Sequence, residues 1–175
     1  KSPDNFEKIE QLIKNGAGNL SLTVANTYTG TTVISAGAVI VFDNNSLGAD
    51  GADLVIGSNG TLVLGNFSLT LQQIMLLNNG ATISNANDFS SHSLAGAQTW
   101  LGTINLNVST GAQIYFDGVV TGGTTVTINK AGAGDLIFTQ SNTFNGAANI
   151  TNVNDGALIL ANNDALGDNS PLTLM

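Results

Sequence analysis

The chain has 175 residues, among them 12 Asp and Glu, 4 Lys, a single His and no Arg, and its formal net charge is −8. The absence of arginine removes the bidentate guanidinium group that recognises phosphates and base edges, and the negative charge disfavours nucleic acid and anionic membranes as partners. Charged residues make up 9% of the chain and hydrophobic residues 42%, with no Cys, which argues against disorder and excludes disulfides. No stretch approaches the roughly 18 consecutive apolar residues of a membrane-spanning helix, so we expect no transmembrane segment.

The first 13 residues are compatible with two structures. Apolar side chains recur there at helical spacing: Phe6, Ile9, Leu12 and Ile13. They follow a Ser-Pro-Asp sequence that is typical of a helix start, but the residues just before Lys14 also resemble those just before Lys130, where strand-like alternation dominates. We therefore expect residues 1–13 to form either a short N-terminal helix or cap, or a lead-in strand. They contain no apolar secretion signal, so we expect a mature chain or a piece of a longer protein.

From residue 14 onward, apolar residues alternate with polar or small ones, and this period of two predicts β-strands. The runs include Leu20-Leu22-Val24, Leu54-Ile56, Leu62-Leu64, Ile104-Leu106-Val108, Val126-Ile128 and Leu158-Leu160. Turn-forming pairs separate them: Asn15-Gly16, Asn59-Gly60, Asn79-Gly80, Thr110-Gly111, Gly122-Gly123, Asn145-Gly146 and Asp155-Gly156. Such spacing is typical of a sandwich, a barrel or a β-solenoid.

An internal repeat distinguishes these alternatives. Residues 14–30 align without a gap on residues 130–146, at an offset of 116, and residues 37–48 align on residues 156–167, at an offset of 119. The difference between the offsets is an insertion confined to one turn, which a solenoid tolerates and a closed barrel does not. The repeat therefore predicts a β-solenoid.

The two copies share a compound motif. It reads KNGAGNLSL, NTYTG, GAVIVF and DNNSLG in the first copy, and KAGAGDLIF, NTFNG, GALILA and NNDALG in the second. The motif resembles the passenger-associated repeat of bacterial autotransporter proteins. This resemblance implies an all-β, right-handed parallel β-helix over residues 14–175, with repeats at 14–48 and 130–167, exported and then displayed at the cell surface or released. The export signal and membrane barrel of such a protein are expected in a longer parent chain.

Repeat lengths of this kind, roughly 22 residues, predict about eight rungs. The densest apolar run in the chain is Ile74-Met75-Leu76-Leu77, which we interpret as a rung buried on both faces, the alternative being a short buried helix.

Catalytic chemistry finds little support in this sequence. His92 is the single histidine, with Asp88 four residues before it and serines around it, but a polar loop projecting from the solenoid explains this segment better than a triad. Glutamate occurs only in the ambiguous first segment, and the aspartates stand in turns, where they serve the local backbone. Lys14 and Lys130 belong to the repeat motif, which predicts a structural position rather than a catalytic base. We expect no enzyme activity and no cofactor.

A calcium site is a further hypothesis. Asp50 and Asp53 stand in the segment LGADGADLVIG, which resembles a calcium-binding repeat rich in glycine and aspartate. That repeat binds metal between tandem copies, and one partial copy is present. We therefore predict no metal, with Asp50 and Asp53 as weak candidates.

Three aromatic residues could offer a platform for a sugar: Tyr28, Trp100 and Tyr115. Tyr28 is matched by Phe144 in the second copy, so its hydroxyl is dispensable and core packing is the better explanation. Trp100 has no counterpart. If a local binding site exists, residues 90–100 are where we expect it, with His92 and Trp100 as weak candidates.

These observations predict a non-catalytic structural or adhesive segment of a secreted or surface-displayed bacterial protein. Its expected partners are a protein or glycan on a host or neighbouring cell. The alternative is a self-associating extracellular filament subunit that stacks through the open strand edges of the solenoid.

Overall fold

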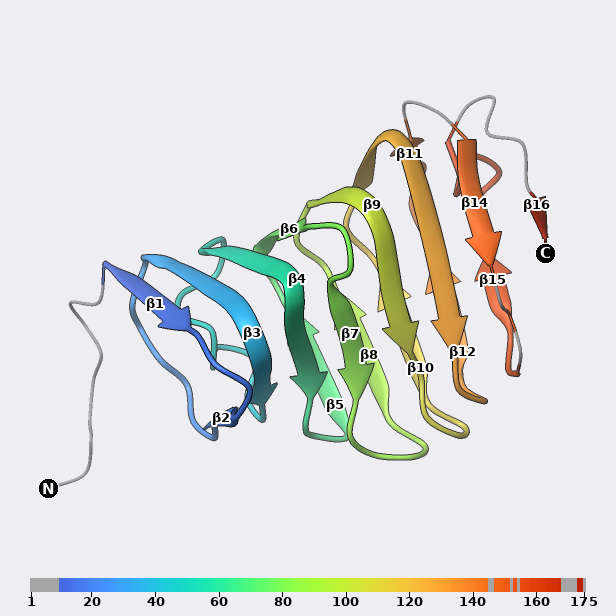
Figure 1. Ribbon diagram of the computed structural model, residues 1–175. Helices are drawn as coiled ribbons and strands as arrows, with labels where there is room; N and C mark the ends of the chain where they lie inside the picture. Colours follow the sequence, from blue (N-terminus) through green and yellow to red (C-terminus); the bar gives the residue numbers. More distant parts are fainter. Residues whose placement is uncertain (1–9, 145–146, 152, 154, 168–172, 175) are drawn as a thin grey trace, which may run out of the picture.

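A computed structural model describes residues 10–144, 147–151, 153, 155–167 and 173–174. Within these residues the chain forms sixteen strands and no helix, and every strand pairing is parallel. Paired residues stand 19 to 24 positions apart in the sequence, from 19 between Asn19 and Ala38 to 24 between Asn149 and Thr173. The result is a parallel β-solenoid of about six turns, somewhat fewer than the eight expected, with β1 and β16 near its two ends (Figure 1).

Each turn carries three strand positions, which we call face 1, face 2 and face 3. Faces 1 and 2 belong to one bent sheet of eleven strands. Face 1 comprises β1 (Gln11–Lys14), β6 (Ile74–Leu77), β13 (Thr143–Phe144) and the first halves of β3 (Thr31–Val41), β4 (Asp53–Leu64), β9 (Gln98–Asn107) and β11 (Val120–Ala131). Face 2 comprises β2 (Asn19–Leu22), β7 (Thr82–Asn85), β14 (Ala147–Thr151), β16 (Thr173–Leu174) and the second halves of β3, β4, β9 and β11.

Face 3 is a separate sheet of five strands. It comprises β5 (Ser68–Leu71), β8 (Ser91–Leu94), β10 (Gln113–Phe116), β12 (Asp135–Phe138) and β15 (Leu158–Leu160). Alternate side chains of all three faces point inward and form one continuous core. At the centre of the later turns, Trp100 packs against the rings of Phe116, Phe138 and Phe144, with ring centroids 5.1, 5.8 and 6.2 Å away.

Two of the expected turns are bends within a continuous strand. Asn59-Gly60 lies inside β4, and Gly122-Gly123 lies inside β11. At the first of these, a Cβ on Gly60 would stand 2.2 Å from the carbonyl oxygen of Ile34. Glycine is needed there because two backbones approach closely, and the pair does not reverse the chain.

The run Ile74–Leu77 forms β6, and the prediction that it is buried on both faces is wrong. Met75 and Leu77 point inward and are buried, whereas Ile74 is 51% exposed and Leu76 is half-buried. An outer solenoid face has no second layer to cover it within the described residues, so alternation sends two aliphatic side chains outward.

At the start of the chain, β1 begins at Gln11, and residues 1–9 lie outside the described residues. Leu12 and Ile13, two members of the helical pattern, are in this strand. None of the described residues belongs to a helix long and apolar enough to cross a membrane.

The two repeats have the same internal register but lie on different faces. In the first copy Leu20 pairs with Val39 on face 2, and in the second copy the equivalent Leu136 pairs with Leu158 on face 3. The motif is therefore a strand, corner and strand unit that is compatible with more than one corner of the solenoid.

Candidate functional site

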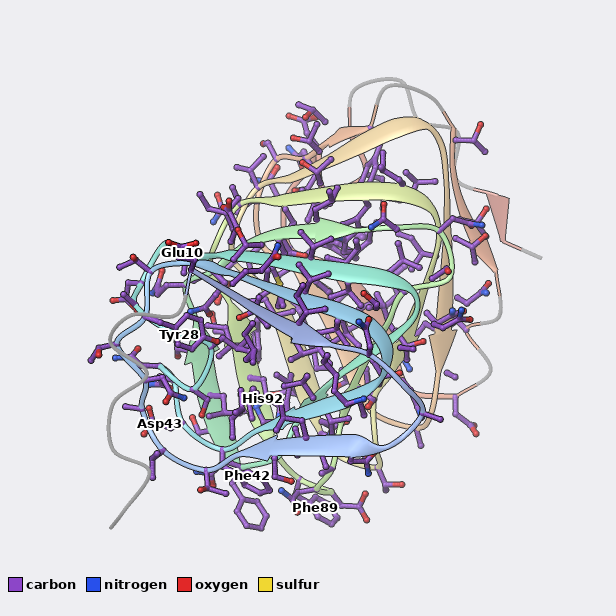
Figure 2. The ribbon with its side chains drawn as sticks, turned by 60° about the vertical axis from the view of Figure 1, so that its left-hand side comes forward. Glu10, Tyr28, Phe42, Asp43, Phe89 and His92 are labelled. Carbon is purple, nitrogen blue, oxygen red and sulfur yellow. The ribbon has the colours of Figure 1, made fainter. Side chains whose placement is uncertain are left out.

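His92 lies inside the solenoid. It occupies the middle of β8, where its cross-strand neighbours are Leu69 and Ile114, and it is 1% exposed. Both ring nitrogens lack a hydrogen-bond partner, and burial lowers the pKa of His92 to about 4. Figure 2 shows its side chain within the ring of strands, whereas Phe89 projects from the edge.

The expectation of a projecting polar loop is therefore wrong for residues 91–94, which form a strand. Without a bond to a carboxylate or a hydroxyl, the His92 imidazole is not arranged as the base of a nucleophilic triad.

Trp100 is also enclosed. It is fully buried, and its indole N–H donates to Oε1 of Gln98 at 3.0 Å. Neither of the two weak ligand-binding candidates, His92 and Trp100, has a ring at the surface. The core position expected for Tyr28 and its counterpart Phe144 is confirmed, since they are 1% and 6% exposed.

The carboxylates are spread over the corners. Asp43 Oδ1 accepts the backbone N–H of Asn45 at 2.9 Å, as expected for a turn aspartate. Asp135, the first residue of β12, bonds the next turn, and its Oδ1 accepts the backbone N–H of Ala157 at 3.0 Å. Asp50 and Asp53, the weak calcium candidates, are exposed. Across the part of the chain that the structure describes, no three or more His, Asp or Glu side chains are grouped so as to hold a metal ion. The absence of a metal remains a prediction.

The repeat lysines bind the chain itself. The ammonium group of Lys14 donates to the carbonyl oxygens of Gly16 at 2.7 Å and Ala36 at 3.0 Å. The ammonium group of Lys130 donates to those of Gly132 and Asp155, both at 2.7 Å.

We call each of these arrangements a lysine clamp. Each ammonium group joins the corner that follows it to the equivalent corner of the next turn. Burial lowers the pKa of Lys130, and Asp135 and Asp155 oppose this effect. The clamps are structural, as the sequence predicted, and they leave neither lysine available as a surface base.

A matching asparagine joins turns elsewhere in the motif. Asn142 accepts the Val120 N–H at 2.7 Å and donates to the Ala165 carbonyl at 2.7 Å, while the equivalent Asn26 donates to the Ser46 carbonyl at 2.7 Å. The sequence analysis did not single out this residue, although its place in the NTY and NTF segments of both copies was a usable signal.

Over the described residues, the outer surface carries charge of one sign. Lys14 is 9% exposed and Lys130 is fully buried, so the described residues present no exposed cation. The exposed carboxylates among them are Glu10, Asp50, Asp53, Asp88, Asp155 and Asp164.

A groove of about 260 Å³ opens on face 1, across β4, β6 and the start of β9. Its outward-pointing lining residues are Asp53, Val55, Ile74, Leu76 and Thr99. This groove is the candidate binding site. It could not be predicted while the run that begins at Ile74 was interpreted as buried on both faces.

Comparison with known proteins gives two matches. The passenger-associated-transport-repeat family matches residues 12–41 and 128–160, which contain both lysine clamps. The chain is also 32% identical over 141 residues to a protein of Brucella suis biovar 1 (strain 1330) named Adhesin BmaC autotransporter. The matched region is 80% of this chain but 3% of that protein, so the chain spans only a small part of its relative. No solved structure matches the chain.

The parallel solenoid and its two clamped repeats place the chain among β-solenoid repeat proteins. More particularly, the chain belongs to the autotransporter passenger domains that carry passenger-associated repeats. It is therefore part of a surface-displayed or secreted protein. Neither match supports the filament alternative.

Proposed function

We propose that this segment is a non-catalytic, adhesive part of a surface-displayed passenger, and that it works as a rigid rod whose outer strand faces contact another surface. The observation that carries the proposal is that the interior of the solenoid is filled by the chain's own side chains. Inward side chains fill the core along the whole solenoid, and the single histidine is buried in it without a partner. Contact with other molecules is thereby left to the outer faces.

Two further facts support an adhesive role. A rod of about six turns at about 4.8 Å each is roughly 30 Å long, and its parallel ladders give a regular surface suited to extended contact. The Brucella suis protein to which the chain is similar is named an adhesin. The partner is a protein or glycan on the surface of a host or neighbouring cell.

The direct test is binding of the purified chain to cells. Fluorescent beads coated with the 175-residue chain should bind epithelial cells saturably, and free chain should compete. Beads coated with an unrelated protein of similar net charge serve as the control. Equal binding of the two kinds of bead, or binding that free chain does not reduce, would overturn the adhesive role.

The absence of catalysis needs a separate measurement. Acidic polysaccharides incubated with the chain should show no change in length distribution. Turnover that disappears when Asp50 and Asp53, or Asp117 and Asp155, are replaced in pairs by Asn would contradict the non-catalytic part of the proposal.

A further inference from the structure

Face 1 carries an outward row of aliphatic side chains on four successive turns. Ile13 pairs with Val33, Val33 with Val55, and Val55 with Leu76. We call this row the aliphatic stripe. At a strand spacing of about 4.8 Å it extends over roughly 14 Å.

The stripe ends abruptly. The position that follows Leu76 in the same row is Thr99, and Thr121 and Thr143 come after it. A threonine therefore suits this position on the later turns, so the fold does not require aliphatic side chains there. An in-register apolar row that faces outward is the kind of surface feature that marks a contact site.

The groove lies at the end of the stripe where β4, β6 and β9 run side by side (Figure 1). Val55 and Leu76 contribute the apolar floor, and Ile74, which is 51% exposed, adds a further aliphatic side chain. Asp53 pairs directly with Ile74 across the strands, so one exposed carboxylate stands beside this apolar surface.

The surface charge indicates what kind of ligand the groove can bind. The described residues expose carboxylates and no cation, so an anionic ligand or a second copy of this chain would bring like charges together. An apolar floor beside a carboxylate instead suits a side chain with an aliphatic stem and a cationic head, which are the properties of lysine and arginine.

We propose that the groove binds a lysine- or arginine-containing extended segment of a partner protein. The aliphatic stem of the basic residue lies on Val55 and Leu76, and its charged head meets Asp53. Neighbouring apolar residues of the segment continue along the aliphatic stripe. This inference rests on the proposed adhesive function and specifies the chemistry of its protein partner.

The test uses a capped seven-residue peptide with one central lysine flanked by valine and threonine, and the intact 175-residue chain. Isothermal titration calorimetry should show saturable binding to the lysine peptide. Replacing the lysine with norleucine keeps the stem and removes the charge. Replacing it with diaminopropionic acid keeps the charge and shortens the stem. Each change should weaken binding, and a glutamate peptide should not bind.

Variants of the chain locate the site. Asp53→Asn should weaken binding of the lysine peptide by up to about fivefold, the range of an exposed ion pair, and should reduce its dependence on salt. Asp50→Asn is the matched control, because it removes an exposed carboxylate outside the groove. Ile74→Lys should abolish binding by placing the chain's own ammonium group beside Asp53. All three altered side chains are exposed, and unchanged thermal melting would verify that the variants fold.

Three results would overturn the proposal: no binding of the lysine peptide, equal effects of Asp53→Asn and Asp50→Asn, or equal binding of the lysine and norleucine peptides. Beads coated with the Asp53→Asn variant separate this failure from failure of the adhesive role. If wild-type and variant beads bind cells equally, the adhesive function stands and the groove is not its contact site.

Discussion

At the scale of single residues, the repeat lysines show how a charged side chain becomes a structural element. Lys130 is fully buried, and its ammonium group donates to two carbonyl oxygens that belong to successive turns, those of Gly132 and Asp155. Both carbonyl oxygens lie 2.7 Å from this buried ammonium group. The lysine supplies the donors that they would otherwise lack.

Replacing Lys130 with Met should therefore cost about 3 kcal/mol of unfolding free energy, because two charge-assisted hydrogen bonds are lost and two carbonyls are left unpaired. Urea unfolding followed by circular dichroism measures this loss. Lys14→Met is the matched comparison, and its effect should be smaller because Lys14 is partly exposed and water can reach its partners. A loss below about 0.5 kcal/mol for Lys130→Met, the range of ordinary surface changes, would contradict the clamp.

His92 is the opposite case, a buried polar group without partners. An unfolded histidine titrates near 6.5, whereas the pKa of His92 in the folded chain is about 4. Between these values the unfolded state binds the additional proton, so stability falls as the pH drops from 6.5 to 4 and this contribution is constant below that. The contribution amounts to about 3 kcal/mol.

His92→Leu should remove this pH dependence and raise stability at pH 7.5, since the row on either side of it consists of Leu69 and Ile114. Urea midpoints of both proteins at pH 7.5, 6, 5 and 4 measure the difference. The two proteins differ at this one residue, so the difference isolates His92. Parallel midpoint curves for the two proteins would show that the imidazole finds a partner in solution.

At the scale of elements, the corner that follows each clamp depends on glycine. Gly37 has a φ of +71°, and a Cβ on it would stand 2.4 Å from the carbonyl oxygen of Gly16 and 2.5 Å from that of Gly18. Gly16 has a similar φ of +86°, but a Cβ on it would meet nothing within 4 Å. The two glycines therefore separate backbone strain from steric conflict.

Gly16→Ala should cost about 1–2 kcal/mol, the penalty of the left-handed region for an L-residue. Gly37→Ala should cost at least about 3 kcal/mol, because the same penalty is joined by a clash with the carbonyl oxygen of Gly16, which the lysine clamp holds in place, and with that of Gly18. Chemical denaturation of the two variants tests this order. Equal losses of unfolding free energy in the two variants would contradict the steric argument. They would mean that the corner relaxes around the added Cβ of the Gly37→Ala variant.

The strands, the two repeats and the structural position of both lysines could be predicted from the sequence because they depend on local pattern. The change of face between the copies could not. An offset of 116 residues exceeds five turns by about one strand and its corner, and the turns differ in length from 19 to 24 residues. Only the pairing of Leu20 with Val39 on one sheet, and of Leu136 with Leu158 on the other, shows the rotation.

The burial of the His92 ring was not predicted, although the sequence contained a signal for it. Ser91, His92, Ser93 and Leu94 alternate between polar and larger side chains, as the residues of a strand do. The polar residues around His92 led to the interpretation of a projecting loop instead of a strand. The groove was missed for a related reason. Alternation alone does not tell whether the outward half of an apolar strand is covered, and at Ile74 it is not.

At the scale of the whole molecule, the internal use of both described lysines explains why the surface that the structure describes carries charge of one sign. Both clamps turn a cation inward, and the turn aspartates remain outside. Like charges along a rod repel each other and destabilise the compact state. This favours a soluble, separate rod over lateral association of copies.

Screening that repulsion should stabilise the fold, so the urea midpoint should rise between about 10 and 150 mM NaCl, over which the Debye length falls from about 30 to 8 Å. Calcium chloride at equal ionic strength should give the same rise, because Asp50 and Asp53 do not belong to a group of three or more potential metal ligands among the described residues. Asp50→Asn and Asp53→Asn should respond to calcium as the wild type does. A midpoint that rises further in calcium than in sodium at matched ionic strength, and that loses this excess in the Asp53→Asn variant, would show that a cation binds at the edge of the groove. Such a cation would then compete directly with the basic side chain proposed to bind there.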